Sequence, residues 1–179
     1  MKVEPLGLEG LLLIEPRLFR DQRGQFLEAW NRARYAEAGL PDSFVQDNVS
    51  WSRPRVLRGL HLQDPFPQGK LVSVLQGEVW DVAVDLRRGS GTFGQWRGVT
   101  LSADNARQLY IPEGFAHGFV VTSQVDALFV YKCTESYRPE TEITLRWDDA
   151  DLAIDWPVAD PVLSEKDRAG LRLRQVYPG

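Results

Sequence analysis

A histidine and an arginine lie close together inside one apolar segment, residues 56–63. Such side chains are costly in an apolar strand unless they are hydrogen-bonded or face a wet cavity. Strict alternation would place Arg58 and His61 on opposite faces of the strand, although Gly59 leaves room for a bulge that re-aims one of them. Taken alone, the segment favours a hydrogen-bonded core histidine beside a surface arginine over a pair with a catalytic role.

The second histidine, His117, lies in the string I-P-E-G-F-A-H-G-F, whose proline and glycines predict a tight turn that leads into a strand. Two histidines raise the question of a metal site. Zinc and iron sites commonly take three or four protein ligands, and neither histidine has a partner at H-x-H or H-x-x-x-H spacing. We therefore predict no metal, and leave open a site that carboxylates such as Asp81 or Glu113 would complete.

Four further residues carry groups that suit proton or charge chemistry. Lys70 opens a strand, where it either extends into solvent or places a cation at a cavity mouth, beside a phosphate or a developing enolate. Tyr131 fits the pattern of a core tyrosine, and Tyr137 is either a surface aromatic or a platform for a base ring. Asp167 fits a helix cap that begins at Ser164. Each of these signals is weak by itself.

The elements that must position these groups are mostly short strands. Residues 71–75 and 78–86 flank Gln76-Gly77 and give the clearest hairpin signal in the chain. Both faces of the second arm carry apolar residues, which suits a barrel or sandwich whose inner face also holds a polar cavity. Further strands are expected at residues 10–15, 26–30, 44–50, 56–63, 94–100, 107–111, 116–122, 127–134 and 141–146.

Helices are scarce in this pattern. Asn31 can cap a short helix over residues 32–38, and Ser164 can cap another that opens with Glu165-Lys166-Asp167. Ten or more strands with a few short helices predict an all-β architecture. A jelly-roll sandwich or small barrel is the expected closure, because many strand edges would otherwise stay exposed. We expect residues 1–179 to form a single domain, since the chain is too short for two typical ones.

Composition narrows the function classes. Apolar residues make up 43% of the chain and charged residues 26%, which argues against disorder. The net charge of −4 gives no overall attraction to nucleic acid or to an anionic membrane, so we expect neither as a partner. The single cysteine, Cys133, excludes an intramolecular disulfide and a cysteine-rich zinc site. With no signal peptide or membrane span recognisable, a cytoplasmic location is expected.

Taken in order, these segments closely resemble the dTDP-4-dehydrorhamnose 3,5-epimerase family of cupin-like enzymes. The resemblance runs from about residue 19 to residue 167 without a large insertion, and implies a cupin-type jelly roll. Departures at Leu62, at Ser136 and in the short loop 64–67 affect the expected sugar and base contacts. The matching strings are D-Q-R-G-Q-F-L-E (21–28), F-V-Q-D-N (44–48), L-R-G-L-H-L-Q (57–63), Q-G-K-L-V (68–72), G-E-V-W-D-V-A-V-D-L-R (77–87), I-P-E-G-F-A-H-G-F (111–119), Y-K-C-T (131–134) and S-E-K-D (164–167).

The resemblance implies a role for each matching residue. His61 resembles the general base, and Tyr131 resembles the general acid on the opposite face of the sugar. Asp167 resembles the carboxylate that supports His61, and Lys70 the cation near the sugar C4 oxygen. Tyr137 resembles the aromatic residue that stacks on thymine. The other residues that match the lining of the nucleotide-sugar site are Arg23, Glu28, Gln46, Asp47, Asn48, Arg58, His117, Glu142 and Lys166.

The substrate implied by the resemblance is dTDP-4-dehydro-6-deoxy-D-glucose, and the product is dTDP-4-dehydro-L-rhamnose. The C4 ketone of this substrate makes the protons on C3 and C5 acidic, because either carbanion delocalises as an enolate. Inversion then needs a base on one face, an acid on the other and a positive group at the C4 oxygen. No cofactor is expected, since the ketone is itself the electron sink. The resemblance also implies a homodimer whose N-terminal segments reach the neighbouring subunit's site.

Three other functions stay open at the level of the sequence. The nearest is an epimerase that acts at only one centre, C3 or C5, of a related dTDP-4-keto sugar. A metal-dependent cupin oxygenase would be built around His61 and His117. A sugar-nucleotide binding module would need no opposed acid and base, so the combination of His61, Tyr131, Lys70 and Asp167 disfavours it.

Overall fold

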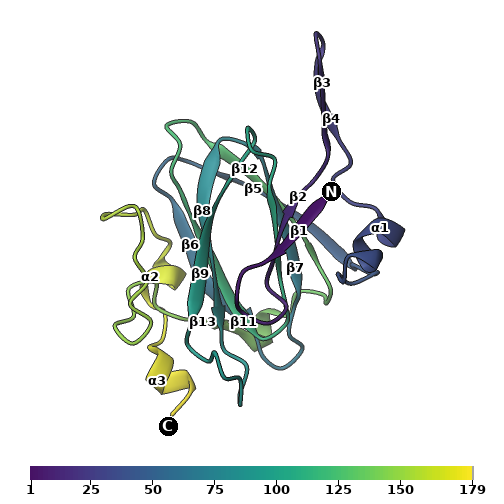
Figure 1. Cartoon of the computed structure of the whole chain (residues 1–179). Helices are drawn as coiled ribbons and strands as arrows, with labels where there is room; N and C mark the ends of the chain where they lie inside the picture. The colour runs from purple at the N-terminus through teal and green to yellow at the C-terminus, as the bar shows by residue number, and fades with distance from the viewer. Residues whose placement is uncertain (179) are drawn as a thin grey trace.

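Two antiparallel sheets pack against each other in the computed structural model, which describes residues 1–178 (Figure 1). The larger sheet has the strand order β1-β2-β10-β7-β12-β5, and the smaller has the order β13-β6-β11-β8-β9. A separate pair, β3 and β4, forms a hairpin that projects from the body of the molecule. The all-β sandwich predicted from the sequence is confirmed.

The strands are short, as their turn-rich sequence predicts. They are β1 Lys2–Pro5, β2 Leu12–Glu15, β3 Leu18–Asp21, β4 Gly24–Leu27, β5 Gln46–Ser52, β6 Leu57–Gln63, β7 Lys70–Gln76, β8 Glu78–Asp85, β9 Trp96–Ser102, β10 Gln108–Ile111, β11 Phe115–Val121, β12 Ala127–Cys133 and β13 Glu142–Thr144. The sequence prediction located most of them to within a few residues, and its list of strands did not include β1 or β3.

Both predicted helices are present with their predicted caps. Asn31 accepts a hydrogen bond from the backbone of Arg34 at 3.1 Å, and α1 spans Arg32–Glu37. Ser164 caps α2 (Glu165–Arg168). The structure adds α3 (Leu173–Val176) and a 3₁₀ turn, η1 (Pro139–Thr141), which were not predicted. None of the helices within residues 1–178 is long and apolar enough to cross a membrane.

The hairpin predicted at Gln76-Gly77 is wrong. β7 pairs with β10 and β12 in the larger sheet, whereas β8 pairs with β9 and β11 in the smaller one. Gly77 has a φ of +73°, and a Cβ at this position would lie 2.8 Å from the carbonyl oxygen of Asp126. The glycine therefore serves a sharp corner that carries the chain between sheets. Local turn residues alone do not distinguish such a corner from a hairpin.

Both faces of β8 are buried, as its sequence predicts. Val79 and Ala83 face the core between the two sheets. Trp80 and Val82 face the other way and pack under the C-terminal segment, where the ring centroids of Trp80 and Trp156 are 5.2 Å apart. The smaller sheet is thus held between two apolar layers, and the cavity described below opens beside the inner one.

A bulge in β6 brings two of its side chains to the same cavity. His61 lies opposite His117 of β11, whereas Arg58 lies opposite Phe119, so β6 has one residue more than β11 between these pairs. A bulge of this kind shifts the alternation of side chains by one residue. Arg58 and His61 consequently both line the cavity, although strict alternation would separate them.

The bulge depends on Gly59, whose φ is +126° and whose added Cβ would lie 2.6 Å from the Cα of Gly118. Gly59→Ala is expected to lower the free energy of unfolding by about 1–3 kcal/mol, because strain at positive φ and overpacking both oppose the alanine. Denaturant unfolding measures this loss. Gly91→Ala is the control, since among residues 1–178 its Cβ would meet nothing within 4 Å. Equal stability of the two variants would contradict the role of Gly59.

Candidate active site

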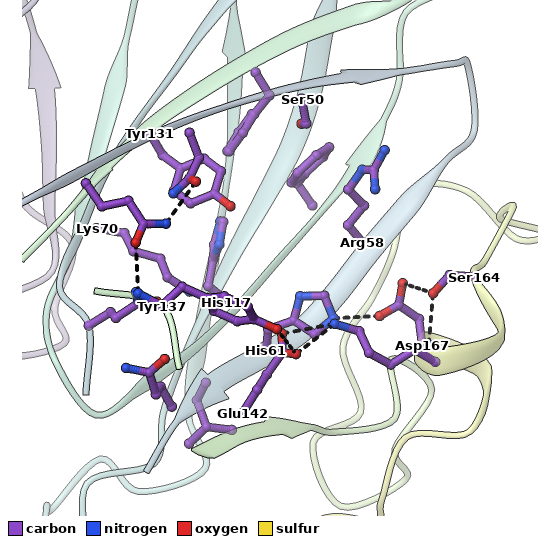
Figure 2. A pocket seen from close by; sticks show the side chains of 18 residues that line it. Ser50, Arg58, His61, Lys70, His117, Tyr131, Tyr137, Glu142, Ser164 and Asp167 are labelled. Atoms are coloured by element: carbon purple, nitrogen blue, oxygen red, sulfur yellow. Dashed lines mark hydrogen bonds and ion pairs between the residues drawn. The ribbon is translucent and has the colours of Figure 1, made fainter. Parts of the chain in front are cut away.

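A cavity of about 570 Å³ is lined by residues of both sheets and of α2 (Figure 2). The structure brings together most of the residues that the sequence singled out. Those that line the cavity are Gln46, Asn48, Arg58, His61, Lys70, His117, Tyr131, Tyr137, Glu142, Lys166 and Asp167.

His61 is held by a buried carboxylate. Its Nε2 lies 2.6 Å from Oδ1 of Asp167, and Ser164 donates a hydrogen bond to Oδ2 of Asp167 at 2.7 Å. Burial opposes ionisation of Asp167, but the hydrogen bonds from His61 and Ser164 outweigh it and hold the pKa of this carboxyl below its usual range. Because Nε2 is engaged by the carboxylate, Nδ1 is the nitrogen of His61 that remains for a substrate.

Asp167 has both of the roles considered for it from the sequence, the helix cap and the support of His61. Its backbone N–H donates to Oγ of Ser164 at 3.1 Å, which is the predicted helix cap. Its side chain reaches His61 across 106 residues of sequence. The cap therefore fixes the carboxylate that orients the imidazole.

The phenol of Tyr131 and the ammonium of Lys70 come from the larger sheet, whereas His61 comes from the smaller one. Figure 2 shows Tyr131 and Lys70 on one side of the cavity and the His61–Asp167 pair on the other. Burial raises the pKa of Tyr131, so its hydroxyl stays protonated at neutral pH. Burial lowers the pKa of Lys70, while Cys133 and two nearby carboxylates act in the opposite direction.

The outer part of the cavity is polar and linked by hydrogen bonds. Glu142 accepts hydrogen bonds from Lys166 at 3.0 Å and from the hydroxyl of Tyr137 at 2.9 Å. These two bonds outweigh burial and hold the pKa of Glu142 below its usual range. Gln46 accepts from the backbone N–H of Tyr137 and donates to Asn48. Tyr137 is 48% exposed, which leaves its ring accessible for stacking.

The second histidine, His117, places Nε2 2.9 Å from the buried carboxylate of Asp81. Each histidine thus has a carboxylate partner of its own, and the two do not converge on one point of coordination. Within residues 1–178 no group of three or more His, Cys, Asp or Glu side chains is arranged to hold a metal ion.

Three residues expected at the site lie outside the cavity of their own chain. Arg23 lies at the turn of the β3–β4 hairpin and pairs with Asp21 at 2.5 Å. Glu28 follows the same hairpin and pairs with an arginine of α1. Asp47 alternates with the cavity-lining residues of β5 and pairs with Lys132 at 3.0 Å. The substrate-binding roles of Arg23, Glu28 and Asp47 stay predictions.

The sequence missed several cavity-lining residues. The alternation of Gln46 and Asn48 on β5 would have pointed to Ser50, which lies on the same face. Phenyl rings carry no such signal, because a cavity-lining phenylalanine and a core phenylalanine obey the same pattern. The residues missed are Ser50, Gln63, Gln68, Phe119, Phe129 and Ser164.

Comparison with known proteins assigns the chain to a family. The sequence model of the family described as dTDP-4-dehydrorhamnose 3,5-epimerase matches residues 5–175. The chain belongs to this family. A relative from Pseudomonas aeruginosa that bears the same name is 57% identical over 172 residues, covering 95% of this chain and 94% of the relative. The family resemblance predicted from the eight strings is thereby confirmed.

Two further relatives of this epimerase-family chain are similar to it over nearly its whole length. The crystal structure of a Legionella pneumophila dTDP-6-deoxy-D-glucose-3,5-epimerase in complex with dTDP-4-keto-L-rhamnose has a TM-score of 0.94 and 52% identity, covering 98% of this chain and 94% of that one. A dTDP-4-dehydrorhamnose 3-epimerase from Streptomyces niveus is 42% identical over 98% of this chain and 85% of the relative. The cupin-like sandwich expected for the family is thus the fold of this epimerase.

Proposed function

We propose that this protein inverts C3 and C5 of dTDP-4-dehydro-6-deoxy-D-glucose to give dTDP-4-dehydro-L-rhamnose. One observation carries the proposal: an imidazole backed by a carboxylate, a protonated phenol from the opposite sheet and a buried ammonium line one cavity. The 3,5-epimerase names of the Pseudomonas and Legionella relatives, and the keto-sugar bound in the Legionella structure, support the substrate class.

The arrangement assigns one task to each group. His61 takes the proton from C3 or C5, and the electron pair of the broken C–H bond moves onto the C4 oxygen as an enolate. Lys70 stabilises this developing charge, and such stabilisation is commonly the largest contribution to a rate. Tyr131 returns a proton to the same carbon from the opposite face, which inverts it. Solvent then restores the proton on Tyr131 and removes the one on His61, so no cofactor is consumed.

The outer part of the cavity suits a nucleoside diphosphate. Tyr137 offers an exposed ring to thymine, while Lys166 and Arg58 offer cations to the diphosphate. The amides of Gln46 and Asn48 line the same cavity. A cavity of about 570 Å³ lies within the range of small-molecule sites.

The configuration of the product tests the reaction. Purified protein is incubated with dTDP-4-dehydro-6-deoxy-D-glucose, and proton couplings in the NMR spectrum report the configuration at C3 and C5. We expect both centres to be inverted. Inversion at C3 alone would favour the single-centre reaction, a candidate because the Streptomyces niveus relative is named a 3-epimerase. Tight binding without any inversion would favour a binding module.

We also propose that the protein is a homodimer in which the β3–β4 hairpin completes the neighbouring subunit's site. The hairpin projects from the body of its own chain (Figure 1). Its Phe19 and Phe26 are exposed, which suits a buried position in a partner. Arg23 and Glu28 lie on or beside this hairpin, away from the cavity of their own chain.

Mixing two complementary variants tests the shared site, at a substrate concentration low enough that neither variant alone is appreciably active. Arg23→Ala weakens substrate binding, and His61→Ala removes the base. If the hairpin acts in the partner's site, unfolding and refolding the two variants together is expected to restore roughly a quarter of native activity, since half of the dimers are mixed and each holds one intact site. Each variant refolded alone is the control. Activity no higher than the average of the two controls would contradict the shared site.

We also propose that the protein is located in the cytoplasm. The only cysteine, Cys133, is buried and unpaired, as is usual for proteins of a reducing compartment. Cell fractionation followed by the epimerase assay tests it, and activity recovered outside the cytoplasmic fraction would contradict it.

A further inference from the structure

A second histidine–carboxylate pair lies beside the cavity, and the reaction described above assigns no task to its carboxylate. Nε2 of His117 lies 2.9 Å and 3.1 Å from the two carboxylate oxygens of Asp81. The side chain of Asp81 is fully buried, whereas that of His117 keeps 9% of its surface exposed and lines the cavity. Asp81 therefore reaches the substrate only through His117.

The strands leave the imidazole of His117 little freedom. On β11 it lies opposite His61 of β6 on one side and Ala83 of β8 on the other. Its ring lies parallel to that of Phe129, with centroids 6.1 Å apart and an angle of 21° between the planes. With Nε2 turned to the buried carboxylate, Nδ1 is the nitrogen that His117 can offer to a substrate.

The His117–Asp81 pair lies near Lys70, the cation assigned to the substrate's C4 oxygen. His117 and Lys70 line the same cavity, and the charges of Asp81 and Lys70 act on each other. Burial raises the pKa of Asp81, while His117 and Lys70 act to lower it. A carboxyl of Asp81 that keeps its proton donates it to Nε2, which leaves the ring proton of His117 at Nδ1. Such a donor suits an oxygen on which negative charge develops.

We propose that Asp81 is a positioning residue of the epimerisation: it holds His117 at Nε2, so that Nδ1 of His117 meets the substrate's C4 oxygen beside Lys70. This inference rests on the proposed function and adds a second group at the enolate oxygen. Asp81 acts on the step in which charge develops, and it has no task in holding the nucleotide. Its loss is therefore expected to affect kcat more than KM.

Asp81→Ala tests the inference, with Asp85→Ala as the matched control. An asparagine at position 81 would still donate to Nε2 and keep N–H at Nδ1, so alanine is the informative change. Both aspartates lie on the same face of β8 and are fully buried, but Asp85 pairs with Arg87 away from the cavity. We expect Asp81→Ala to lower kcat by about 10²-fold, the size of effect seen for one oxyanion donor, with KM and dTDP affinity within about threefold of native. Asp85→Ala is expected to lower thermal stability and to leave kcat of the folded enzyme unchanged.

A double-mutant cycle tests whether Asp81 acts through His117. Adding Asp81→Ala to His117→Ala is expected to cause no further loss of kcat, because the carboxylate then has no imidazole to hold. Three results would each overturn the inference: losses that multiply in the double variant, a native kcat in Asp81→Ala, or an equal loss of kcat in Asp85→Ala. A native enzyme without epimerase activity would instead overturn the proposed function, so the two failures are distinguishable.

Discussion

His61→Ala is expected to lower kcat for epimerisation by about 10²–10⁴-fold, the usual contribution of a positioned general base. The expectation follows from the contact between Nε2 of His61 and the buried carboxylate of Asp167, which leaves Nδ1 as the base. Both centres depend on the same imidazole, so inversion at C3 and at C5 is expected to fall together. A steady-state assay with NMR detection of each centre measures the two losses.

The nucleotide provides the control for this variant. Tyr137 and Lys166 lie in the outer part of the cavity, so the affinity of His61→Ala for dTDP is expected to equal that of the native protein in calorimetry. Asp167→Asn is also expected to lower kcat, because it weakens the hydrogen bond that orients the imidazole of His61. A His61→Ala variant that retains more than about a tenth of native kcat would contradict the assignment of the base.

Tyr131→Phe is expected to separate proton removal from inversion. The variant keeps His61 and Lys70, so the enolate still forms and His61 can return a proton to the face from which it came. Inversion is expected to fall by about 10²–10⁴-fold, the contribution of a positioned acid. In D₂O, the recovered substrate is expected to gain deuterium at C3 or C5 faster than product appears, and NMR measures both rates.

A second buried tyrosine of the larger sheet serves as the control. Burial raises the pKa of Tyr110 to about 12, and this residue does not line the cavity. Tyr110→Phe is expected to leave inversion unchanged. If Tyr131→Phe inverted both centres at the native rate, the phenol could not be the acid.

Local features of the sequence predicted much of the fold. Asn31 and Ser164 cap helices because a side-chain oxygen that accepts from the first turn is a local interaction, readable from a few residues. The corner at Gly77 was misread because a tight turn looks the same whether the next strand joins the same sheet or the opposite one. Strand pairing depends on contacts between distant segments, which turn residues do not reveal.

The site was harder to derive from residues than the fold. From its neighbouring residues Asp167 fitted a helix cap; the family resemblance implied that its carboxylate supports His61, and the folded chain shows both contacts. Gly59 left open a bulge, but which side chain it re-aims depends on the register with β11. The pairing of Asp81 with His117 spans 36 residues of sequence and two neighbouring strands. The family resemblance supplied the roles that composition and spacing left undecided.

Deuterium labelling tests most directly whether an imidazole and a phenol exchange protons with the sugar from opposite faces. The native enzyme converts dTDP-4-dehydro-6-deoxy-D-glucose in D₂O, and NMR locates deuterium in the product. We expect one solvent deuterium at C3 and one at C5, both with inverted configuration. Product that carries deuterium at only one of these carbons, or at neither, would contradict proton transfer at both centres by His61 and Tyr131.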